Sequence, residues 1–238
     1  MIQRLGQRWQ SLRAEHGSAT VAALYLLHRV LQVLSRGRAA VVPYLLVAQP
    51  VGNAVLAEVK PDLGTVVRRI GPDDPVTAEF PRPPEVVAAR FAAGAECHVV
   101  FVKERFAGFI WIMRARYVED EVRCTYEIAN PAAGVWDFDV YVEPRLRLGR
   151  TMARLWKAVD DTLVAEGVRW SFSRINRFNT ASVRSHQRLG ARSIGSAVFL
   201  VLGPLQLALG GGKRLPSVSL GAGIGPQLRI QAPLPPAP

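Results

Sequence analysis

The sequence contains little cysteine, and this excludes two classes of protein. Only Cys97 and Cys124 occur among the 238 residues. Two cysteines cannot form the disulfide framework of a small secreted domain, and no second pair is present to suggest a zinc site. Both lie in apolar stretches typical of strands, so we expect buried thiols, no bound metal and a cytoplasmic location.

A long apolar run is also missing. The most apolar stretch near the start, residues 20–34, is interrupted by His28, Arg29 and Gln32. It is too short and too polar to span a bilayer. It also lies too far into the chain, and lacks a cleavage site, for a secretory signal. We therefore expect neither a transmembrane segment nor a secretion signal.

Acidic residues are scarce as well. The chain has 19 of them against 30 basic residues, which gives a net charge of +11. The first forty residues hold six arginines and one acid, and residues 94–205 hold sixteen basic residues and twelve acids. Such a surface attracts anionic ligands, phospholipid head groups or nucleic acid. No recognition motif and no interleaving of basic with aromatic residues is present, which disfavours sequence-specific binding of nucleic acid.

Residues 21–36 have the apolar spacing of an amphipathic helix, and Gly37 ends it. Its apolar stripe consists of Leu24, Leu27, Leu31 and Leu34. Two interpretations remain open at this point. The helix packs on the main domain or on a twin subunit of a homodimer, or it lies as a basic helix on an anionic membrane surface.

The rest of the chain alternates strands with helices. A strand at 41–51 contains Pro43 and Pro50, so we expect it at a sheet edge. The further strands expected are 66–70, 98–102, 106–113, 122–128, 135–142, 168–175 and 194–202, and the helices expected are 84–93, 149–166 and 179–189. The segment after Gly210 is rich in Gly and Pro without periodicity, which favours flexibility. We therefore predict an extension (1–62), a main domain (63–206) and a flexible tail (207–238).

Two local sequences within residues 63–206 are similar to those of a known family. The first is Val-Glu-Pro at 142–144, followed by an arginine-rich turn into a helix, and the second is NTASVRSHQRLGA at 179–191. With the order of the elements, they resemble the GNAT superfamily of acyl-CoA-dependent N-acyltransferases, in which Val-x-Pro precedes Arg/Gln-x-x-Gly-x-Gly/Ala. Arg150 and Met152 stand where the family has its two glycines, and Ala191 stands where it usually has an aromatic residue.

The resemblance implies an α/β (α+β) fold with a mixed, mostly antiparallel central sheet flanked by helices. It also implies acetyl-CoA, or another acyl-CoA, as the acyl donor. The pantetheine arm would lie along the strand that ends at Val142, and the pyrophosphate would lie at the next helix N-terminus, where backbone N–H groups and arginines favour an anion. The candidate cofactor-binding residues are Val140, Tyr141, Val142, Arg145, Arg147, Leu148, Gly149, Arg150, Thr151, Asn179 and Ser182.

The resemblance also proposes catalytic residues. His186 occupies the position, usually a tyrosine, that protonates the departing thiolate, and an unperturbed histidine titrates near pH ~6.5. The alternative is a histidine that is hydrogen-bonded for packing alone. The candidates for the base are Glu127, Asp137 and Asp139, any of which Arg123 or Arg174 can neutralise.

Strand alternation and helix capping make two further predictions. Asp137 and Asp139 are expected to share a face with Tyr141, opposite an apolar face. Asn179 is expected to act first as a helix N-cap.

The function implied is transfer of an acyl group, with acetyl as the first expectation, from acyl-CoA to an amine of a small molecule. The basic surface disfavours a cationic acceptor. A longer acyl chain stays open, because Trp111, Trp136 and Phe138 can line an apolar channel or belong to the core. The alternative function is a GNAT-like domain that binds acyl-CoA or a partner without catalysis, peripheral to an anionic membrane.

Overall fold

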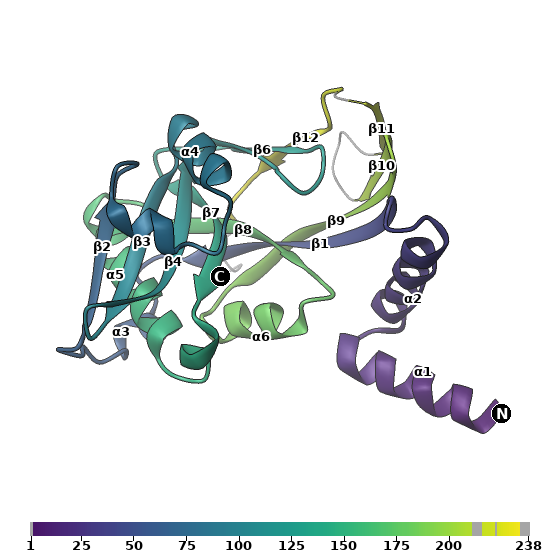
Figure 1. Cartoon of the computed structure of the whole chain (residues 1–238), viewed down its shortest axis with the longest axis horizontal. Helices are drawn as coiled ribbons and strands as arrows, with labels where there is room; N and C mark the ends of the chain where they lie inside the picture. The colour runs from purple at the N-terminus through teal and green to yellow at the C-terminus, as the bar shows by residue number, and fades with distance from the viewer. Residues whose placement is uncertain (1, 211–215, 222, 234–238) are drawn as a thin grey trace, which may run out of the picture. The chain divides into compact units, whose positions relative to one another are not determined.

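The computed structural model describes residues 2–210, 216–221 and 223–233 (Figure 1). They form two compact units, each assembled from separate stretches of the chain. Unit 1 holds the described residues of 1–48, 118–127 and 174–238, and unit 2 holds residues 49–117 and 128–173. These units do not follow the predicted boundaries after residues 62 and 206.

Unit 2 is built on a sheet in the order β2-β3-β4-β7-β8. Its strands are β2 (Thr65–Ile70), β3 (Glu96–Val102), β4 (Arg105–Arg114), β7 (Gly134–Val142) and β8 (Trp170–Asn176, of which the residues up to Ser173 belong to this unit). The pairs β2–β3, β3–β4 and β4–β7 are antiparallel, whereas β7 and β8 are parallel. This confirms the mixed, mostly antiparallel sheet that was expected. The predicted hairpin turns at Lys103 and Glu104, whose positive φ angles of 50° and 63° suit a tight two-residue turn.

Helices surround this sheet. They are α3 (Ala54–Ala57), η1 (Pro75–Glu79), α4 (Pro84–Ala92), η2 (Pro144–Leu146) and α5 (Thr151–Ala165). The long helix α5 contacts β2, β3 and β4. Its buried residues Leu155, Trp156, Val159 and Leu163 recur every three or four positions, as the sequence predicted. A short strand, β5 (Arg116–Val118), follows β4.

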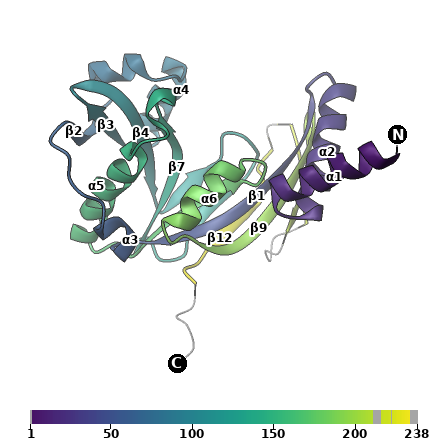
Figure 2. The ribbon, with the colours of Figure 1, turned by 90° about the horizontal axis from the view of Figure 1, so that it is seen from below.

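Unit 1 contains an antiparallel sheet in the order β11-β10-β9-β1. Its strands are β1 (Ala39–Pro50, of which the residues up to Ala48 belong to this unit), β9 (Arg192–Leu202), β10 (Leu205–Gly210) and β11 (Ser217–Leu220). β1 and β9 run side by side over most of their length (Figure 2). The unit also contains α6 (Thr180–Arg188), β6 (Thr125–Ile128) and β12 (Gln227–Ile230).

The predicted edge position of β1 is wrong. β1 pairs with β9 along one side, and on its other side the carbonyl of Pro43 accepts a hydrogen bond from the Arg177 N–H at 2.8 Å. In an antiparallel strand the N–H and C=O of one residue point to the same side. The missing N–H of Pro43 therefore faces away from β9 and removes no hydrogen bond from that ladder.

The predicted flexible tail is also corrected where the structure describes it. β10, β11 and β12 all lie after the last strand that the sequence predicted. The Gln206 side chain accepts the Arg123 N–H at 2.8 Å and donates to the Arg123 carbonyl at 2.7 Å. The Thr125 N–H donates to the carbonyl of Pro226 at 2.9 Å. These bonds make the segment part of unit 1. Residues 211–215, 222 and 234–238 of the predicted tail lie outside the described residues.

The chain begins with two helices, α1 (Ile2–His16) and α2 (Ala19–Leu34). The Ser18 hydroxyl caps α2 by accepting the Val21 N–H at 3.1 Å. Among the described residues, no single helix is long and apolar enough to cross a membrane. The segments 6–16 and 19–34 together pass by length and composition, but the chain bends by 109° between them.

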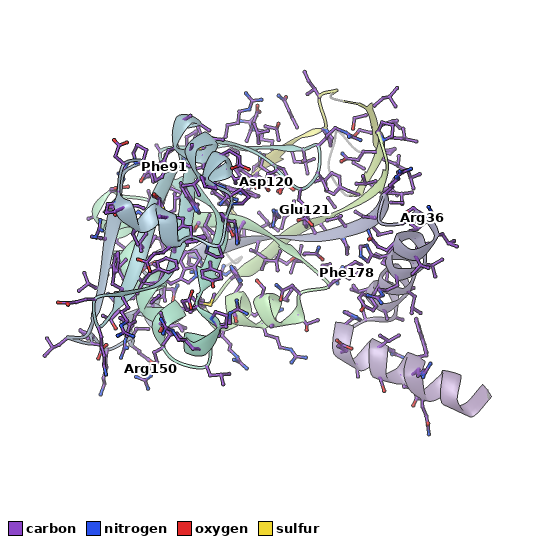
Figure 3. The ribbon with its side chains drawn as sticks, in the orientation of Figure 1. Arg36, Phe91, Asp120, Glu121, Arg150 and Phe178 are labelled. Atoms are coloured by element: carbon purple, nitrogen blue, oxygen red, sulfur yellow. The ribbon has the colours of Figure 1, made fainter. Side chains whose placement is uncertain are left out.

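The helix α2 is present as predicted, but the face that contacts the sheet is not the predicted leucine stripe. His28 Nδ1 accepts the Val41 N–H at 3.2 Å, and the Gln32 amide donates to the Ala39 carbonyl at 2.9 Å. The Tyr25 ring packs edge-on against Phe178, which lies beside α2 (Figure 3). Leu24 and Leu31 are half-buried, whereas Leu27 and Leu34 are exposed. The helix therefore packs on unit 1 through a face other than the leucine stripe.

Candidate cofactor-binding and catalytic sites

Strand β7 carries a bulge in the middle of the predicted cofactor strand. The register places Phe109 opposite Tyr141 and Trp111 opposite Phe138, so that Ile110 faces two residues, Asp139 and Val140. Asp139 has a φ of 45°, a conformation that a non-glycine residue rarely adopts. A bulge bends the strand and leaves its extra residue outside the regular ladder.

The bulge overturns the predicted alternation of the strand. The Tyr141 ring stacks on Phe109 at 5.5 Å and on Phe106 at 6.3 Å. Asp139 contacts Arg90, whose guanidinium lies over Phe138 at 5.3 Å. Asp139 and Tyr141 therefore face the aromatic side of the sheet. The prediction that they share a face with Asp137, opposite the apolar side chains, is wrong because one extra residue reverses the side on which they emerge.

One edge of β7 is open over its second half. Within the part of the chain that the structure describes, β7 pairs with β8 only through residues 134–136, which lie opposite residues 170–172. The backbone groups from Asp137 to Val142 on that edge take no part in this ladder. An open strand edge can pair with an extended ligand through its N–H and C=O groups.

The turn after β7 leads into α5 and is largely exposed. Arg145, Arg147, Leu148, Gly149 and Arg150 are all exposed, and Thr151 is buried at the helix start. No side chain caps the helix, and its first turn has no acidic residue. The first N–H groups of α5 are thus available to an anion. Arg150, at the start of α5 (Figure 3), adds positive charge at this end.

Arg147 is tied to the end of β7. Its Nε donates to the Val142 carbonyl at 2.9 Å, and its guanidinium lies 5.8 Å from the centre of the Tyr141 ring. The Tyr141 hydroxyl bonds Glu143 Oε1 at 3.1 Å, and the same carboxylate lies 3.8 Å from Arg145 Nε. The predicted residues 141–147 are therefore brought together around the junction of β7 with the turn.

Asp139 is held by two arginines that the sequence analysis did not identify. Arg82 Nε donates to Asp139 Oδ2 at 2.8 Å, and Arg90 Nη1 forms an ion pair with the same oxygen. Both carboxylate oxygens of Asp139 are thus engaged by guanidinium groups. Arg82 lies in a loop and Arg90 in α4, and no periodic signal connects either of them with Asp139.

Asp137 is buried and accepts a hydrogen bond from the Ser171 hydroxyl at 2.7 Å. Ser171 lies in the stretch where β7 and β8 pair, opposite Val135, and Asp137 lies just beyond that stretch. Bonding to a neighbouring strand satisfies part of the cost of burying this carboxylate. The structure therefore gives Asp137 a packing role at the base of the open edge.

The second predicted motif lies in unit 1. Asn179 Oδ1 accepts the Ser182 N–H at 3.0 Å, which confirms the predicted N-cap of α6. His186 is buried, and its Nδ1 lies 2.9 Å from the Ser182 carbonyl. A carbonyl can only accept, so Nδ1 carries the proton and Nε2 is the basic nitrogen of the neutral ring. Ser182 is half-buried and contributes its backbone to both bonds.

Glu127, on β6, is the remaining carboxylate among the predicted catalytic residues. Its side chain is half-buried, and among the described residues it has no hydrogen-bond or ion-pair partner. Arg123 does not neutralise it, because that side chain bonds the Ser219 hydroxyl and the Pro204 carbonyl. Glu127 thus differs from Asp137 and Asp139, which are both engaged.

Unit 1 also contains a buried ion pair between Glu119 and Arg174, which no signal in the sequence indicated. The Glu119 side chain is fully buried and bonds Arg174 Nε at 2.7 Å. Burial raises the pKa of Glu119 above its usual value, and the hydrogen bond from Arg174 opposes this. The Arg174 guanidinium lies 4.8 Å from the centre of the Tyr44 ring, and the Tyr44 hydroxyl bonds Glu121 at 2.5 Å. Arg174 was expected to neutralise a base candidate and pairs with Glu119 instead.

The predicted residues thus fall into two groups. Residues 137–151 lie in unit 2, whereas Glu127, Asn179, Ser182 and His186 lie in unit 1. A hollow of about 240 Å³ lies elsewhere in unit 2, beside α5 and the segment before β2, and none of the predicted site residues lines it.

The sequence also raised the placement of three aromatic residues, the state of the two cysteines and the presence of a metal-binding cluster. Trp111, Trp136 and Phe138 are buried in the core. Both cysteines are free and buried as predicted, and burial raises the pKa of Cys124 to about 12. Among the described residues, no cluster of three or more His, Cys, Asp or Glu side chains could hold a metal ion.

Comparison with known proteins gave results for structure only. No protein-family model matches the chain, and no curated protein sequence matches it significantly. A functionally unknown conserved protein from Staphylococcus epidermidis matches with a TM-score of 0.51 and 12% identity, over 73% of this chain and 66% of that one. A tandem GNAT protein from the clavulanic acid biosynthesis pathway matches with a TM-score of 0.48 and 14% identity, over 72% and 57%.

A putative acetyltransferase from the GNAT family of Novosphingobium aromaticivorans matches with a TM-score of 0.43 and 17% identity, over 68% of this chain and 65% of that one. This chain spans less than two thirds of the length of each of these three proteins. The order of its own elements is an antiparallel hairpin, an antiparallel strand with an open edge, a helix, a parallel strand, a helix and a last strand. The TM-score of 0.51 shows that the chain shares its fold with the conserved protein from Staphylococcus epidermidis.

Proposed function

We propose that the chain is an acyl-CoA-dependent N-acyltransferase that transfers an acyl group, with acetyl as the first expectation, to an amine of a small molecule. The amine nitrogen forms a bond to the thioester carbonyl carbon, and the carbon–sulfur bond breaks. The protonated amine must first lose a proton to a base to become the nucleophile; the nitrogen loses a second proton as the amide forms, and the departing thiolate gains one.

The observation that carries this proposal is the junction of β7 with α5. The open edge of β7 after Trp136 can pair with the extended pantetheine arm. The uncapped start of α5 follows directly, and Arg145 and Arg150 lie exposed before it. Unpaired N–H groups, the helix dipole and guanidinium groups all favour a pyrophosphate there.

For proton transfer, the proposal keeps two residues that the family resemblance assigned, Glu127 and His186, both of which belong to unit 1. Glu127 is half-buried and has no partner among the described residues, so its carboxylate can accept a proton from the amine. The His186 ring, whose Nδ1 lies 2.9 Å from the Ser182 carbonyl, can exchange a proton at Nε2.

The test is thermal denaturation of the purified chain with coenzyme A, acetyl-CoA and longer acyl-CoAs. A ligand that binds only the folded state adds about 2.7 kcal/mol at a hundred times its dissociation constant. We expect a rise in Tm that is lost in an Arg147→Glu/Arg150→Glu variant. The length of acyl chain that gives the largest rise identifies the donor.

The matched control is Arg116→Glu/Arg169→Glu, which makes the same charge change at two exposed arginines of unit 2 outside the turn. This control should keep the full Tm rise. An equal loss in both variants would show a general charge effect rather than a cofactor site. No rise with any acyl-CoA would refute both the transferase and a silent acyl-CoA-binding domain.

A silent acyl-CoA-binding domain is the second candidate, and one observation favours it. The turn has Arg150 and Met152 at the positions of the family's glycines, and both are larger. Turnover decides between the two functions, measured as release of the free thiol of coenzyme A with a panel of small amines. The two protein thiols are buried and give little background. A Tm rise without thiol release would favour the silent domain.

A further inference from the structure

The outer face of α2 is apolar and exposed. Its exposed large side chains are Leu26, Leu27, Val30, Val33 and Leu34, and Val33 and Leu34 are 73% and 77% exposed. They recur at the spacing of a single helical stripe. The opposite face holds Tyr25, His28 and Gln32, which contact the rest of unit 1. The helix therefore turns its polar side inward and its apolar side to solvent.

A second apolar surface lies on the sheet of the same unit. Leu205 faces Leu202 on β9 and Leu220 on β11, so these three side chains form one row across the sheet. Leu209 and Val218 belong to the same face by their register. All five are exposed, whereas Gln206, Ala208 and Ser219 on the other face are buried.

The two surfaces adjoin at one end of unit 1. The turn between β9 and β10 is bonded to the segment that follows α2, since the Gly203 N–H donates to the Arg38 carbonyl at 2.9 Å. α2 lies near the ends of these strands (Figure 1). We call these ten exposed residues of α2 and β9–β11 the apolar surface. An exposed apolar area of this extent marks an interaction site.

The charge of the molecule indicates what covers this surface. The sequence stretches 1–48, 118–127 and 174–238 contain 15 basic and five acidic residues, a net charge of +10, and 13 of the basic residues are among those described in unit 1. Unit 2 contains 15 basic and 14 acidic residues. Residues 174–238 contain eight basic residues and no acid. A second copy of the chain would bring two such units together, which like-charge repulsion opposes. An anionic partner is favoured.

We propose that unit 1 docks on the surface of an anionic phospholipid bilayer, with the apolar surface entering the boundary between head groups and acyl chains. Arg29 on α2 and Arg38 beyond it are exposed and can contact the phosphates. α2 has 16 residues, and the chain bends by 109° before it. A short helix with one apolar face lies in the plane of the interface. This inference stands independently of the proposed enzymatic activity.

The test is cosedimentation of the full chain with vesicles of phosphatidylcholine alone and of phosphatidylcholine mixed with phosphatidylglycerol. We expect binding to the mixed vesicles, and high salt should weaken it because salt screens the attraction. A Val33→Asn/Leu34→Asn variant should bind roughly tenfold more weakly. Arg29→Gln and Arg38→Gln should each weaken binding roughly fivefold.

The matched control is Leu63→Asn/Val66→Asn, which removes two exposed apolar side chains from unit 2. It should bind as the parent does. Equal binding to both kinds of vesicle, or full binding by Val33→Asn/Leu34→Asn, would overturn the proposal. So would sedimentation equilibrium that shows a dimer lost in that variant together with no vesicle binding, since the apolar surface would then join two copies.

Discussion

At the residue scale, Glu119 and Arg174 form a buried pair whose contribution to stability depends on pH. Glu119 is fully buried, and its two oxygens bond the guanidinium of Arg174. The raised pKa of Glu119 means that the folded protein holds this proton more tightly than the unfolded chain does. This carboxyl therefore contributes most to stability at low pH, and the contribution is lost as the pH rises above ~4.3.

Replacing Arg174 by leucine should reveal the cost of burying the charged Glu119 carboxylate without a partner. We expect Arg174→Leu to lower the free energy of unfolding by about 3–5 kcal/mol near neutral pH, because it leaves a buried charge without a partner. The defect should be smaller at acidic pH, because the raised pKa of Glu119 favours protonation, which removes the charge. Urea denaturation at both pH values measures it, with the exposed Arg184→Leu as control. Equal defects at both values would contradict the assigned cause.

The roles of the carboxylates Asp139 and Glu127 can be distinguished by substituting each one. Asp139→Asn should lower the free energy of unfolding by about 3 kcal/mol, because Arg82 and Arg90 lose their charged partner. Glu127→Gln should leave stability unchanged and lower kcat by roughly 10²–10⁴-fold if it is the base. Unfolding curves and thiol release measure these two effects. Full activity in Glu127→Gln, with turnover lost in a stable Asp139→Asn, would reverse the assignment.

At the scale of elements, the close approach of β4 and β7 near the end of β7 depends on a glycine in β4. A Cβ on Gly108 would lie 2.2 Å from the Tyr141 carbonyl oxygen, well inside contact distance. Gly108 faces Val142, so the glycine lets β4 and β7 approach each other where the predicted cofactor strand ends.

Gly108→Ala should therefore disturb both stability and ligand binding. We expect a loss of about 1–3 kcal/mol in the free energy of unfolding and a smaller Tm rise with acetyl-CoA. Gly195→Ala in β9 is the matched control, since its new methyl would meet only Leu46 Cδ1 at 3.7 Å. A normal Tm rise in Gly108→Ala would show that the strand end does not position the ligand.

The elements that the sequence predicted are those with local signals. The hairpin of β3 and β4, the face of α5 and the cap at Asn179 depend on turn residues and periodicity, and all three are confirmed. The bulge at Asp139 was not predictable, because alternation carries no sign of one extra residue in the pairing. The buried face of α2 depends on Val41 and Phe178, which are distant in the sequence. The strands after Gly210 were missed because their Gly and Pro content resembles that of a flexible tail.

At the scale of the whole molecule, positive charge is concentrated in one unit. In the sequence, the excess of basic over acidic residues is divided among the N-terminal extension, the main domain and the tail. The structure collects the first and last of these, with residues 118–127, into unit 1, and the sequence stretches 1–48, 118–127 and 174–238 carry +10 of the total +11. Unit 2 is nearly neutral, so the candidate cofactor junction depends on local arginines rather than on the overall charge of its unit.

The interleaving of the two units also determines when they can fold. Ala39 at the start of β1 lies opposite Leu202 at the end of β9, so 163 residues (202 − 39) separate the two partners in the sequence and β1 is synthesised well before β9. At the usual pace of a ribosome this interval lasts roughly 10–30 s. Unit 2 begins at Gln49 and ends at Ser173. Residues 118–127, between its two segments, belong to unit 1. Unit 2 can therefore fold first. The apolar helix α2 is synthesised early, whereas β9, β10 and β11 of the same unit are synthesised only after unit 2 is complete.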